Sequence, residues 1–260
     1  MTKNLESLAA FAGTLADAGA EISLKYFRTS VAADAMAKAD ASPVTIADRE
    51  TETRLREMIE AAYPDHGIFG EEHGSVRTDA EFVWVLDPID GTQSFVTGKP
   101  LFGTLIGLLQ RERAVMGIMD MPALGERWIG IDGEPTTFNG ERLTVRDCPA
   151  LDKAWLYATS PQMFTEQNFP RFEALRHASW RTIYGAECQA YGLLANGWVD
   201  IVCEDTMGPY DYVALAPIVE GAGGVMTDWS GRALNLDGDG TVIAIGDKRL
   251  QGAVMEILAG

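Results

Sequence analysis

A short apolar run that ends in two carboxylates constrains the fold more than any other segment of this chain. Residues 82–86 form an unbroken apolar stretch of the kind that a buried strand makes. The run leads directly into residues 87–92, which read DPIDGT. Pro88 fixes a turn, and Gly91 permits a close approach of the backbone to a ligand. We therefore expect a strand to end here and to direct both carboxylates into one place.

The first half of the chain is predicted to be an α+β unit. Apolar residues recur at helical spacing over residues 4–27, and a second helix fits 46–62, with a loop over 28–45 between them. Apolar runs joined by polar turns predict antiparallel hairpins in the following segments: 104–109, 114–119, 127–131 and the Asn139-Gly140 turn before residues 143–145.

The second half alternates between strands and helices, which is typical of a layered α/β unit. The predicted strands are 154–159, 199–203, 225–227 and 242–245. The predicted helices are 168–178, 188–196, 211–222 and 247–258. The change of character falls near Cys148-Pro149, so we expect one half at residues 1–149 and the other at 150–260.

The composition disfavours several classes of protein. The 260 residues contain no apolar run long enough to span a bilayer, and the first residues lack the apolar core of a secretory signal, so we expect a cytoplasmic protein. Lys and Arg total 21 against 38 Asp and Glu, and the resulting net charge of −17 disfavours binding to nucleic acid. The three cysteines lack C-x-x-C spacing, which favours reduced structural thiols over a disulfide framework or a zinc site.

The DPIDGT segment predicts a phosphate site bridged by metal ions. A helix turn over residues 91–95 would present free backbone N–H groups, which attract phosphate. Two adjacent carboxylates would repel that anion unless cations lie between them, and Mg²⁺ binds carboxylate and phosphate oxygens together. The alternative is a plain turn with an aspartate cap. It is disfavoured because Gly70-Glu71-Glu72 precedes Asp87 and because Pro209-Tyr210-Asp211 begins another predicted helix.

Four segments in this order resemble the inositol monophosphatase superfamily of metal-dependent phosphatases. They are Val44-Thr45-x-Ala47-Asp48, Gly70-Glu71-Glu72, Leu86–Thr92, and Asp211 followed by Glu220-Gly221-Ala222-Gly223-Gly224. The resemblance spans nearly the whole chain and implies an α+β fold, a layered αβαβα sandwich with the active site between its halves. It also implies a homodimer that hydrolyses a small phosphorylated metabolite, with two to three Mg²⁺ ions, or Mn²⁺, as cofactors and with inhibition by Li⁺.

The resemblance implies a role for each matching residue. The metal ligands would be Glu71, Asp87, the Ile89 carbonyl, Asp90 and Asp211. The catalytic residues would be Thr92, with Thr45 and Asp48 behind it to orient the attacking water, and Glu71. The phosphate would lie on the Gly91 and Thr92 amides, and Lys38 matches a lysine in a mobile loop of the family. A hydroxyl and carboxylate pair can orient a water and accept its proton, which agrees with these roles.

Within the superfamily, the second half of the chain looks most like the histidinol-phosphate phosphatases. The similarity lies in residues 184–194, 103–108, 119–122, 125–127 and 209–211. Histidinol carries an ammonium and an imidazole, and Glu204 and Glu187 are the candidates to pair with such a cation. Glu187 departs from that branch, which more often has Asp at this position.

Alternatives remain open for these residues and for the protein. Glu187 could be an exposed carboxylate at a helix start, and Glu204 a surface charge at a strand end. The protein could be an inositol-phosphate phosphatase or a broad sugar-phosphate phosphatase. A catalytically idle metal- or anion-binding protein is a further alternative, which the intact carboxylate set disfavours.

Overall fold

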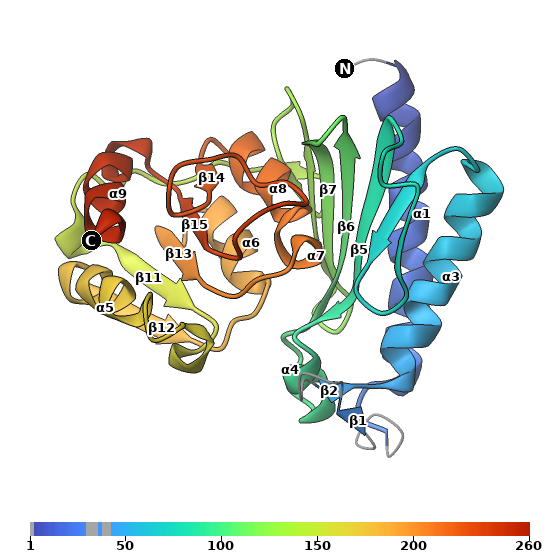
Figure 1. Ribbon diagram of the computed structural model, residues 1–260, viewed down its shortest axis with the longest axis horizontal. Helices are drawn as coiled ribbons and strands as arrows, with labels where there is room; N and C mark the ends of the chain where they lie inside the picture. The colour runs from blue at the N-terminus through green and yellow to red at the C-terminus, as the bar shows by residue number, and fades with distance from the viewer. Residues whose placement is uncertain (1–2, 30–35, 38–42) are drawn as a thin grey trace.

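The computed structural model describes residues 3–29, 36–37 and 43–260, and the described elements stack in five layers (Figure 1). The first layer is the helix pair α1 (Lys3–Tyr26) and α3 (Ile46–Ala62), at the right of the view. Both helices pack on one face of the first sheet, where Leu15 and Leu55 meet Trp84 in one buried cluster. Helix, sheet, helix, sheet and helix layers follow one another, which confirms the predicted αβαβα sandwich.

Within the described residues, the first sheet has eight strands in the order β10-β9-β8-β7-β6-β5-β3-β4. Their bounds are β3 (Gly67–Gly70), β4 (Gly74–Val76), β5 (Phe82–Asp90), β6 (Gly103–Gln110), β7 (Arg113–Met121), β8 (Glu126–Ile131), β9 (Thr137–Phe138) and β10 (Glu141–Arg142). β3 and β5 run parallel, and the other neighbouring pairs are antiparallel. The predicted hairpins are thus confirmed.

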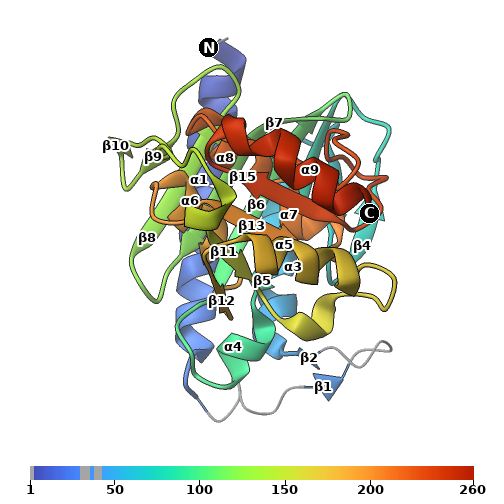
Figure 2. The same ribbon diagram turned by 90° about the vertical axis from the view of Figure 1, so that its left-hand side faces the viewer.

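The second sheet, in the same described part of the chain, has five strands in the order β12-β11-β13-β15-β14. Their bounds are β11 (Trp155–Ala158), β12 (Arg181–Tyr184), β13 (Ile201–Glu204), β14 (Val225–Thr227) and β15 (Val242–Ile245). Between the sheets lie α6 (Gln189–Ala195), α7 (Pro209–Tyr212) and α8 (Leu215–Gly221). The outer face is covered by α5 (Phe169–Ala178) and α9 (Gln251–Ala259), which face the viewer in Figure 2.

A row of glycines brings the middle layer close to the first sheet. Gly107, Gly117 and Gly130 lie opposite one another on β6, β7 and β8. A Cβ at Gly117 would lie 1.7 Å from the Ala214 carbonyl oxygen, and one at Gly130 would lie 2.4 Å from Pro217. No side chain fits in these spaces, so the backbone that begins α8 rests directly on the sheet.

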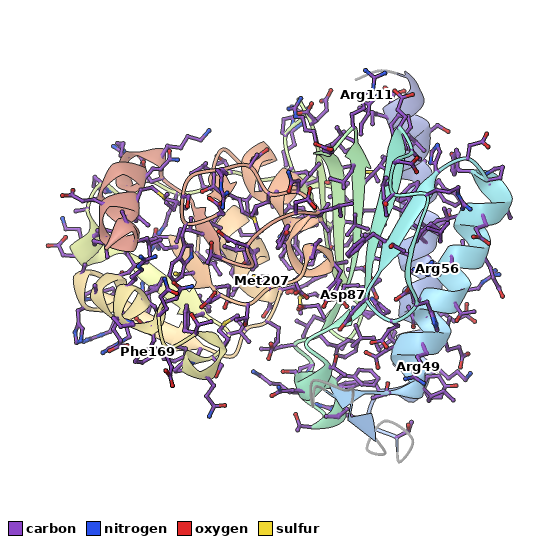
Figure 3. All side chains as sticks on the ribbon, viewed as in Figure 1. Arg49, Arg56, Asp87, Arg111, Phe169 and Met207 are labelled. Carbon is purple, nitrogen blue, oxygen red and sulfur yellow. The ribbon has the colours of Figure 1, made fainter. Side chains whose placement is uncertain are left out.

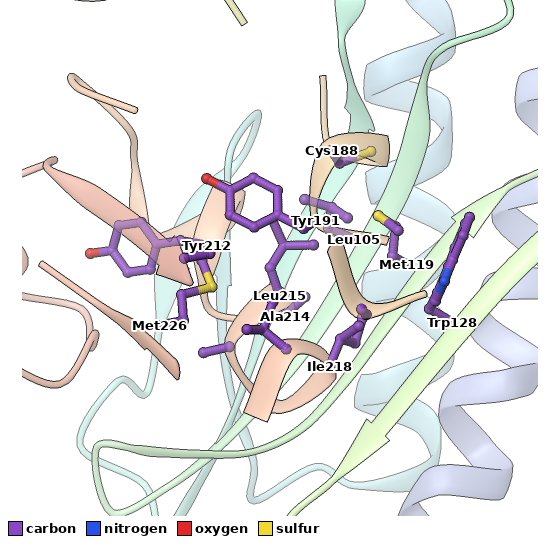
Figure 4. Close-up of a cluster of buried hydrophobic side chains, with 14 of the residues drawn as sticks. Leu105, Met119, Trp128, Cys188, Tyr191, Tyr212, Ala214, Leu215, Ile218 and Met226 are labelled. Atoms are coloured by element: carbon purple, nitrogen blue, oxygen red, sulfur yellow. The ribbon is translucent and has the colours of Figure 1, made fainter. Parts of the chain in front are cut away.

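One hydrophobic cluster joins the two halves (Figure 4). Leu105, Met119 and Trp128 enter it from the first sheet, and Tyr191 and Leu215 enter from α6 and α8. The chain leaves the first sheet at β10 and enters the second at β11. A boundary at residue 149 stays a prediction, because this continuous core contains side chains from both sides of it.

The strand that carries the two aspartates is longer than predicted. β5 continues to Asp90, whereas we expected it to end at Leu86. Its pairing with β6 becomes irregular between Asp87 and Asp90, where one extra residue lies on β5. Pro88 has no N–H to donate to the ladder, and a bulge is where a strand tolerates proline. The two carboxylates therefore extend from a bulge rather than from a turn.

Other boundaries also differ from the prediction. The helix expected at 211–222 divides into α7 and α8, because Pro217 would clash with the carbonyl of the preceding turn in a continuous helix. Residues 143–145 lie beyond the short strand β10 and belong to no strand. The 28–45 loop contains the small pair β1 (Met36–Ala37) and β2 (Pro43–Val44).

Candidate active site

A cavity of about 550 Å³ opens between the two sheets, beside the end of β5. Its lining comes from the carboxylate segments of the first half and, in the second half, from residues 159–163, Glu187 and Asp211. The lining residues are Glu71, Asp87, Ile89, Asp90, Gly91, Thr92, Gln93, Thr159, Ser160, Gln162, Met163, Glu187 and Asp211. Figure 3 labels Asp87, which lies on β5 in the first half, and Met207, which follows β13 in the second half. The cavity therefore brings together every residue that the sequence predicted for binding metal and phosphate.

Three aspartates converge in the cavity. One carboxylate oxygen from each of Asp87, Asp90 and Asp211 lies within 4.8 Å of the others. β5 carries the first two, and the first turn of α7 carries Asp211. Asp87 is buried, whereas Asp90 and Asp211 are half-buried. Glu71, which follows β3, lines the same cavity and keeps its chain in place through an N–H bond of 3.2 Å to the Leu86 carbonyl.

Desolvation and mutual repulsion disfavour the charged forms of these aspartates. Desolvation, followed by the charge of Glu71, raises the pKa of Asp87 well above its usual value. Desolvation and the charge of Glu187 raise the pKa of Asp90 to about 7. Desolvation and the charge of Asp90 raise the pKa of Asp211 to about 8. A divalent cation among these oxygens would relieve both effects, and carboxylate oxygens are the ligands that hard cations take.

Backbone N–H groups orient each carboxylate. Asp87 accepts a bond of 3.0 Å from the Ile89 N–H, and Asp211 accepts one of 2.6 Å from the Gly208 N–H. Asp90 accepts from the Cys188 N–H at 2.8 Å. Each aspartate also offers one carboxylate oxygen to the group of three that lies within 4.8 Å, so the donor set fits a metal site.

Thr45, Asp48 and Thr92 form a connected group, as the sequence predicted. Thr45 caps the start of α3, and its N–H and hydroxyl donate to Asp48 Oδ2 at 2.8 and 2.6 Å. The Thr92 hydroxyl lies 3.1 Å from the Ile89 carbonyl oxygen and 3.5 Å from Asp48 Oδ1. Burial raises the pKa of Asp48, and the bonds from Thr45 oppose that effect. The group connects the Thr92 hydroxyl, which belongs to the cavity lining, to the buried carboxyl of Asp48.

Gly91 has the backbone freedom that the sequence predicted for it. It is in the left-handed region, with φ 80°, at the start of α4 (Thr92–Val96). A Cβ on Gly91 would lie 2.8 Å from the Leu101 carbonyl oxygen and 2.9 Å from Glu187 Cγ. Leu101 and Glu187 therefore occupy the space that a side chain at residue 91 would need, so this position requires glycine.

The candidate substrate residues differ in their surroundings. Glu204 is buried at the end of β13 and accepts from the Thr159 N–H, at 3.0 Å, and from the Thr159 hydroxyl, also at 3.0 Å. It lines a smaller cavity of about 150 Å³ that shares Asp90, Glu187 and Asp211 with the larger one. A surface location for Glu204 is therefore wrong.

Glu187 lines both cavities and accepts from the Ser94 hydroxyl at 2.8 Å. Its φ of 50° is in the left-handed region, which is uncommon for a residue with a side chain. Lys38 lies outside the described residues. The roles of Thr159, Ser94 and Cys188 could not be predicted from the sequence, since no local pattern marks a residue whose partner is far away in the chain.

The layered fold is shared with solved phosphatases. The structure of an inositol monophosphatase from Zymomonas mobilis matches with a TM-score of 0.90 and 44% identity, over 98% of this chain and 98% of that one. A fold of this kind, with carboxylates meeting between its sheets, defines a class of phosphatases that hydrolyse phosphomonoesters.

Comparison of the sequence with known proteins identifies the family of this chain. The model of the inositol monophosphatase family matches residues 4–259, and the chain belongs to this family. The bifunctional phosphatase IMPL2 of Arabidopsis thaliana is 44% identical over 98% of this chain and 75% of its own length. A histidinol-phosphatase of Chlorobaculum parvum is 34% identical over 88% of this chain and 89% of its own length. The family is generally metal-dependent, which agrees with the carboxylate cluster.

Proposed function

We propose that this phosphatase is Mg²⁺-dependent and that its ligands are Glu71, Asp87, the Ile89 carbonyl, Asp90 and Asp211. The convergence of three aspartate oxygens within 4.8 Å carries the proposal. These groups gain stability when a cation neutralises them, since desolvation and repulsion otherwise raise their pKa values. Two to three ions, with Mn²⁺ as a possible substitute, fit a donor set of this size.

The residues around the cluster support hydrolysis by direct in-line attack of water. When bound, Mg²⁺ supplies positive charge to the phosphate oxygens and lowers the pKa of water at the site. The amides of Gly91 and Thr92 bind the phosphate. The Thr92 hydroxyl orients the attacking water, and Asp48, held by Thr45, receives the proton. The raised pKa of Asp48 suits a proton acceptor, because a carboxyl with an ordinary pKa would bind the proton more weakly.

We further propose that the natural substrate is L-histidinol phosphate. The smaller cavity supports this choice, because the buried Glu204 faces it together with Glu187. Desolvation raises the pKa of Glu204 to about 8, and the described residues that line this cavity include no lysine, arginine or histidine as a positive partner for that carboxyl. The ammonium or imidazole of histidinol would supply one. The histidinol-phosphatase from Chlorobaculum parvum adds support from a relative.

An inositol phosphate or a range of sugar phosphates is the second candidate. The Zymomonas mobilis relative is described as an inositol monophosphatase, and the Arabidopsis thaliana relative as bifunctional. The Ser94 bond also occupies part of the Glu187 carboxylate, which leaves less of it for a cation.

Phosphate release from three esters tests the proposal. L-histidinol phosphate, inositol 1-phosphate and p-nitrophenyl phosphate are compared at equal concentrations with Mg²⁺ and with EDTA. We expect the largest kcat/KM for histidinol phosphate and no turnover with EDTA. A preference for inositol phosphate would overturn the substrate assignment. The absence of turnover on every ester would favour the catalytically idle alternative.

Assembly, location and inhibition follow the family resemblance as expectations. We expect a homodimer in the cytoplasm that Li⁺ inhibits. No helix among the described residues is long and apolar enough to cross a membrane. The name of the Arabidopsis thaliana relative places that protein in the chloroplast. Sedimentation tests the expected homodimer, and a Li⁺ titration of the phosphatase activity tests the expected inhibition.

A further inference from the structure

Helix α3 carries two fully buried carboxylates one turn apart, and the proposed mechanism involves only the first of them. Asp48 and Glu52 both have an exposed fraction of 0%. A buried carboxylate is costly unless it is paired and hydrogen-bonded, so its partners show what it holds in place. Asp48 binds the start of its own helix, whereas Glu52 also binds backbone N–H groups outside the helix.

Glu52 binds the turn that follows β3. Its Oε2 accepts from the Glu72 N–H at 2.6 Å, and its Oε1 accepts from the His73 N–H at 3.2 Å. The Arg56 Nε donates to the same Oε1 at 2.6 Å. The Arg56 guanidinium also donates to the Gly74 carbonyl oxygen, and Figure 3 labels this arginine on α3. One ion pair on α3 therefore holds three successive residues of the turn.

The turn held in this way begins with Glu71. On one side, the N–H of Glu71 is bound to the Leu86 carbonyl of β5. On the other side, the next peptide N–H belongs to Glu72 and is bound to Glu52. Both peptide groups that flank the Glu71 Cα are thus fixed, which sets the direction in which its side chain leaves the backbone. That direction leads into the cavity, whose lining includes Glu71.

Gly70 shows how closely Glu52 approaches the turn. A Cβ at Gly70 would lie 2.0 Å from Glu52 Oε1 and 2.8 Å from the Arg56 guanidinium. The carboxylate thus occupies the space that a side chain at residue 70 would need. The glycine in the Gly70-Glu71-Glu72 segment is explained by this contact.

We infer that Glu52 is a positioning residue that holds Glu71 in the orientation required for metal binding. The inference rests on the proposed function, in which Glu71 is a ligand. Arg56 neutralises Glu52 at 2.6 Å, so the effect on the metal comes from geometry rather than from an additional negative charge. Groups that orient a metal ligand typically change metal affinity by about 10- to 100-fold when they are removed.

The test measures Mg²⁺ binding to the ester-free protein by calorimetry. For Glu52→Gln we expect the dissociation constant for Mg²⁺ to rise by about 10- to 100-fold. The amide keeps the size of the side chain, but it can no longer accept both N–H groups with a charged oxygen. Activity should return towards the wild-type kcat at saturating Mg²⁺, since Glu52 touches neither the ester nor the water. If Glu52→Gln does not fold, Glu52→Asp is measured instead, because it keeps the charge and is too short for the turn.

Asp228 offers a matched control. It is a buried carboxylate that accepts from the Ser230 and Arg232 N–H groups at 2.8 Å and pairs with the Arg232 side chain at 2.6 Å. It lines neither cavity described above. Asp228→Asn therefore measures the general cost of losing a buried carboxylate that holds a turn. It should lower the melting temperature and leave the Mg²⁺ affinity unchanged.

Glu71→Gln separates failure of the inference from failure of the proposed function. Unchanged Mg²⁺ affinity in Glu71→Gln would overturn the ligand assignment itself. Weaker binding in Glu71→Gln with wild-type binding in the Glu52 variant would overturn the positioning role. Equal weakening in the Glu52 and Asp228 variants would also overturn it, because the effect would then be a general loss of stability.

Discussion

The backbone N–H of Cys188 donates to the Asp90 carboxylate at 2.8 Å, although the two residues lie 98 positions apart. Nearby, the Ser94 hydroxyl donates to Glu187, and the Lys99 ammonium donates to the Gly185 carbonyl oxygen. The segment 185–188 of the second half is thus bound to the first half beside the proposed metal site. The orientation of Asp90 depends on how the two halves dock.

The stability of the metal-free protein should fall as the pH rises. In the folded chain the pKa of Asp90 is raised from 3.8 to about 7, and that of Asp211 from 3.8 to about 8. Between pH 3.8 and about pH 8, the folded state binds more protons than the unfolded state, so raising the pH favours unfolding. We expect the melting temperature in EDTA to decrease from pH 5 to pH 8.

Mg²⁺ should oppose this loss, because it binds the ionised carboxylates. The increase in melting temperature caused by Mg²⁺ should therefore grow over the same pH range. The measurement is a set of thermal melts with EDTA or Mg²⁺ at several pH values. A Mg²⁺ effect that is independent of pH would contradict the proposed ligand set.

Thr92→Ala should lower kcat on the order of 10²-fold and change KM little. A group that acts on the attacking water stabilises the transition state more than the bound ester, which gives this pattern. Thr97→Ala is the matched control. Thr97 follows the end of the same helix and does not line the cavity, and its hydroxyl donates to the Gln93 carbonyl oxygen. Steady-state kinetics at saturating Mg²⁺ compare the two. A near-wild-type kcat in Thr92→Ala would remove this residue from the mechanism.

Glu204→Gln should reduce kcat/KM for histidinol phosphate far more than for p-nitrophenyl phosphate. Both esters use the same phosphate site, but only the first brings a cation to the buried carboxyl. Removal of one partner from a buried ion pair typically costs about 3–5 kcal/mol.

Asp205→Asn is the control for Glu204→Gln. Asp205 is also buried, and it accepts from the N–H and hydroxyl of Thr165, much as Glu204 accepts from Thr159. It does not line the smaller cavity. Equal losses on both esters in Glu204→Gln would place Glu204 in the shared machinery instead of in substrate selection.

Gly117→Ala should destabilise the fold by about 1–3 kcal/mol, the usual cost of overpacking. Its Cβ would meet the Ala214 carbonyl oxygen at 1.7 Å and would push α8 from the sheet. Because α7 carries Asp211 just before α8, the Mg²⁺ affinity should fall as well. Gly13→Ala in α1 has no atom within 4 Å of the new Cβ, and it should instead stabilise the protein by about 0.5–1 kcal/mol. Denaturant unfolding of both variants checks the contrast.

The parts that sequence could predict have local signals. The sequence predicts the helix at 46–62 with its observed bounds, because apolar residues recur at helical spacing there and a proline follows its end. The antiparallel hairpins follow from apolar runs and polar turns. The family resemblance supplied the order of the layers, which periodicity alone does not contain.

The parts that sequence could not predict depend on distant contacts. The edge strand β12 has mostly exposed side chains and therefore shows no apolar alternation. β3 has glycines at both ends, so its few side chains show no alternation between apolar and polar residues. The bonds from Cys188 to Asp90 and from Glu72 to Glu52 join segments that no local pattern relates. The candidate ligands were predictable from motifs, whereas the groups that orient them were not.

Asp48 takes part both in the capping box of α3 and in the proposed catalytic group, which limits how this position can change in evolution. Asp48 binds the N–H and hydroxyl of Thr45 at the helix start and also faces Thr92. Loss of its carboxylate would weaken the helix as well as the proposed chemistry, since a cap contributes about 1 kcal/mol. The Thr92 hydroxyl donates to the Ile89 carbonyl oxygen at 3.1 Å, but it caps no helix start. A descendant that gives up catalysis while keeping the fold should therefore lose the threonine first and retain an oxygen acceptor at position 48.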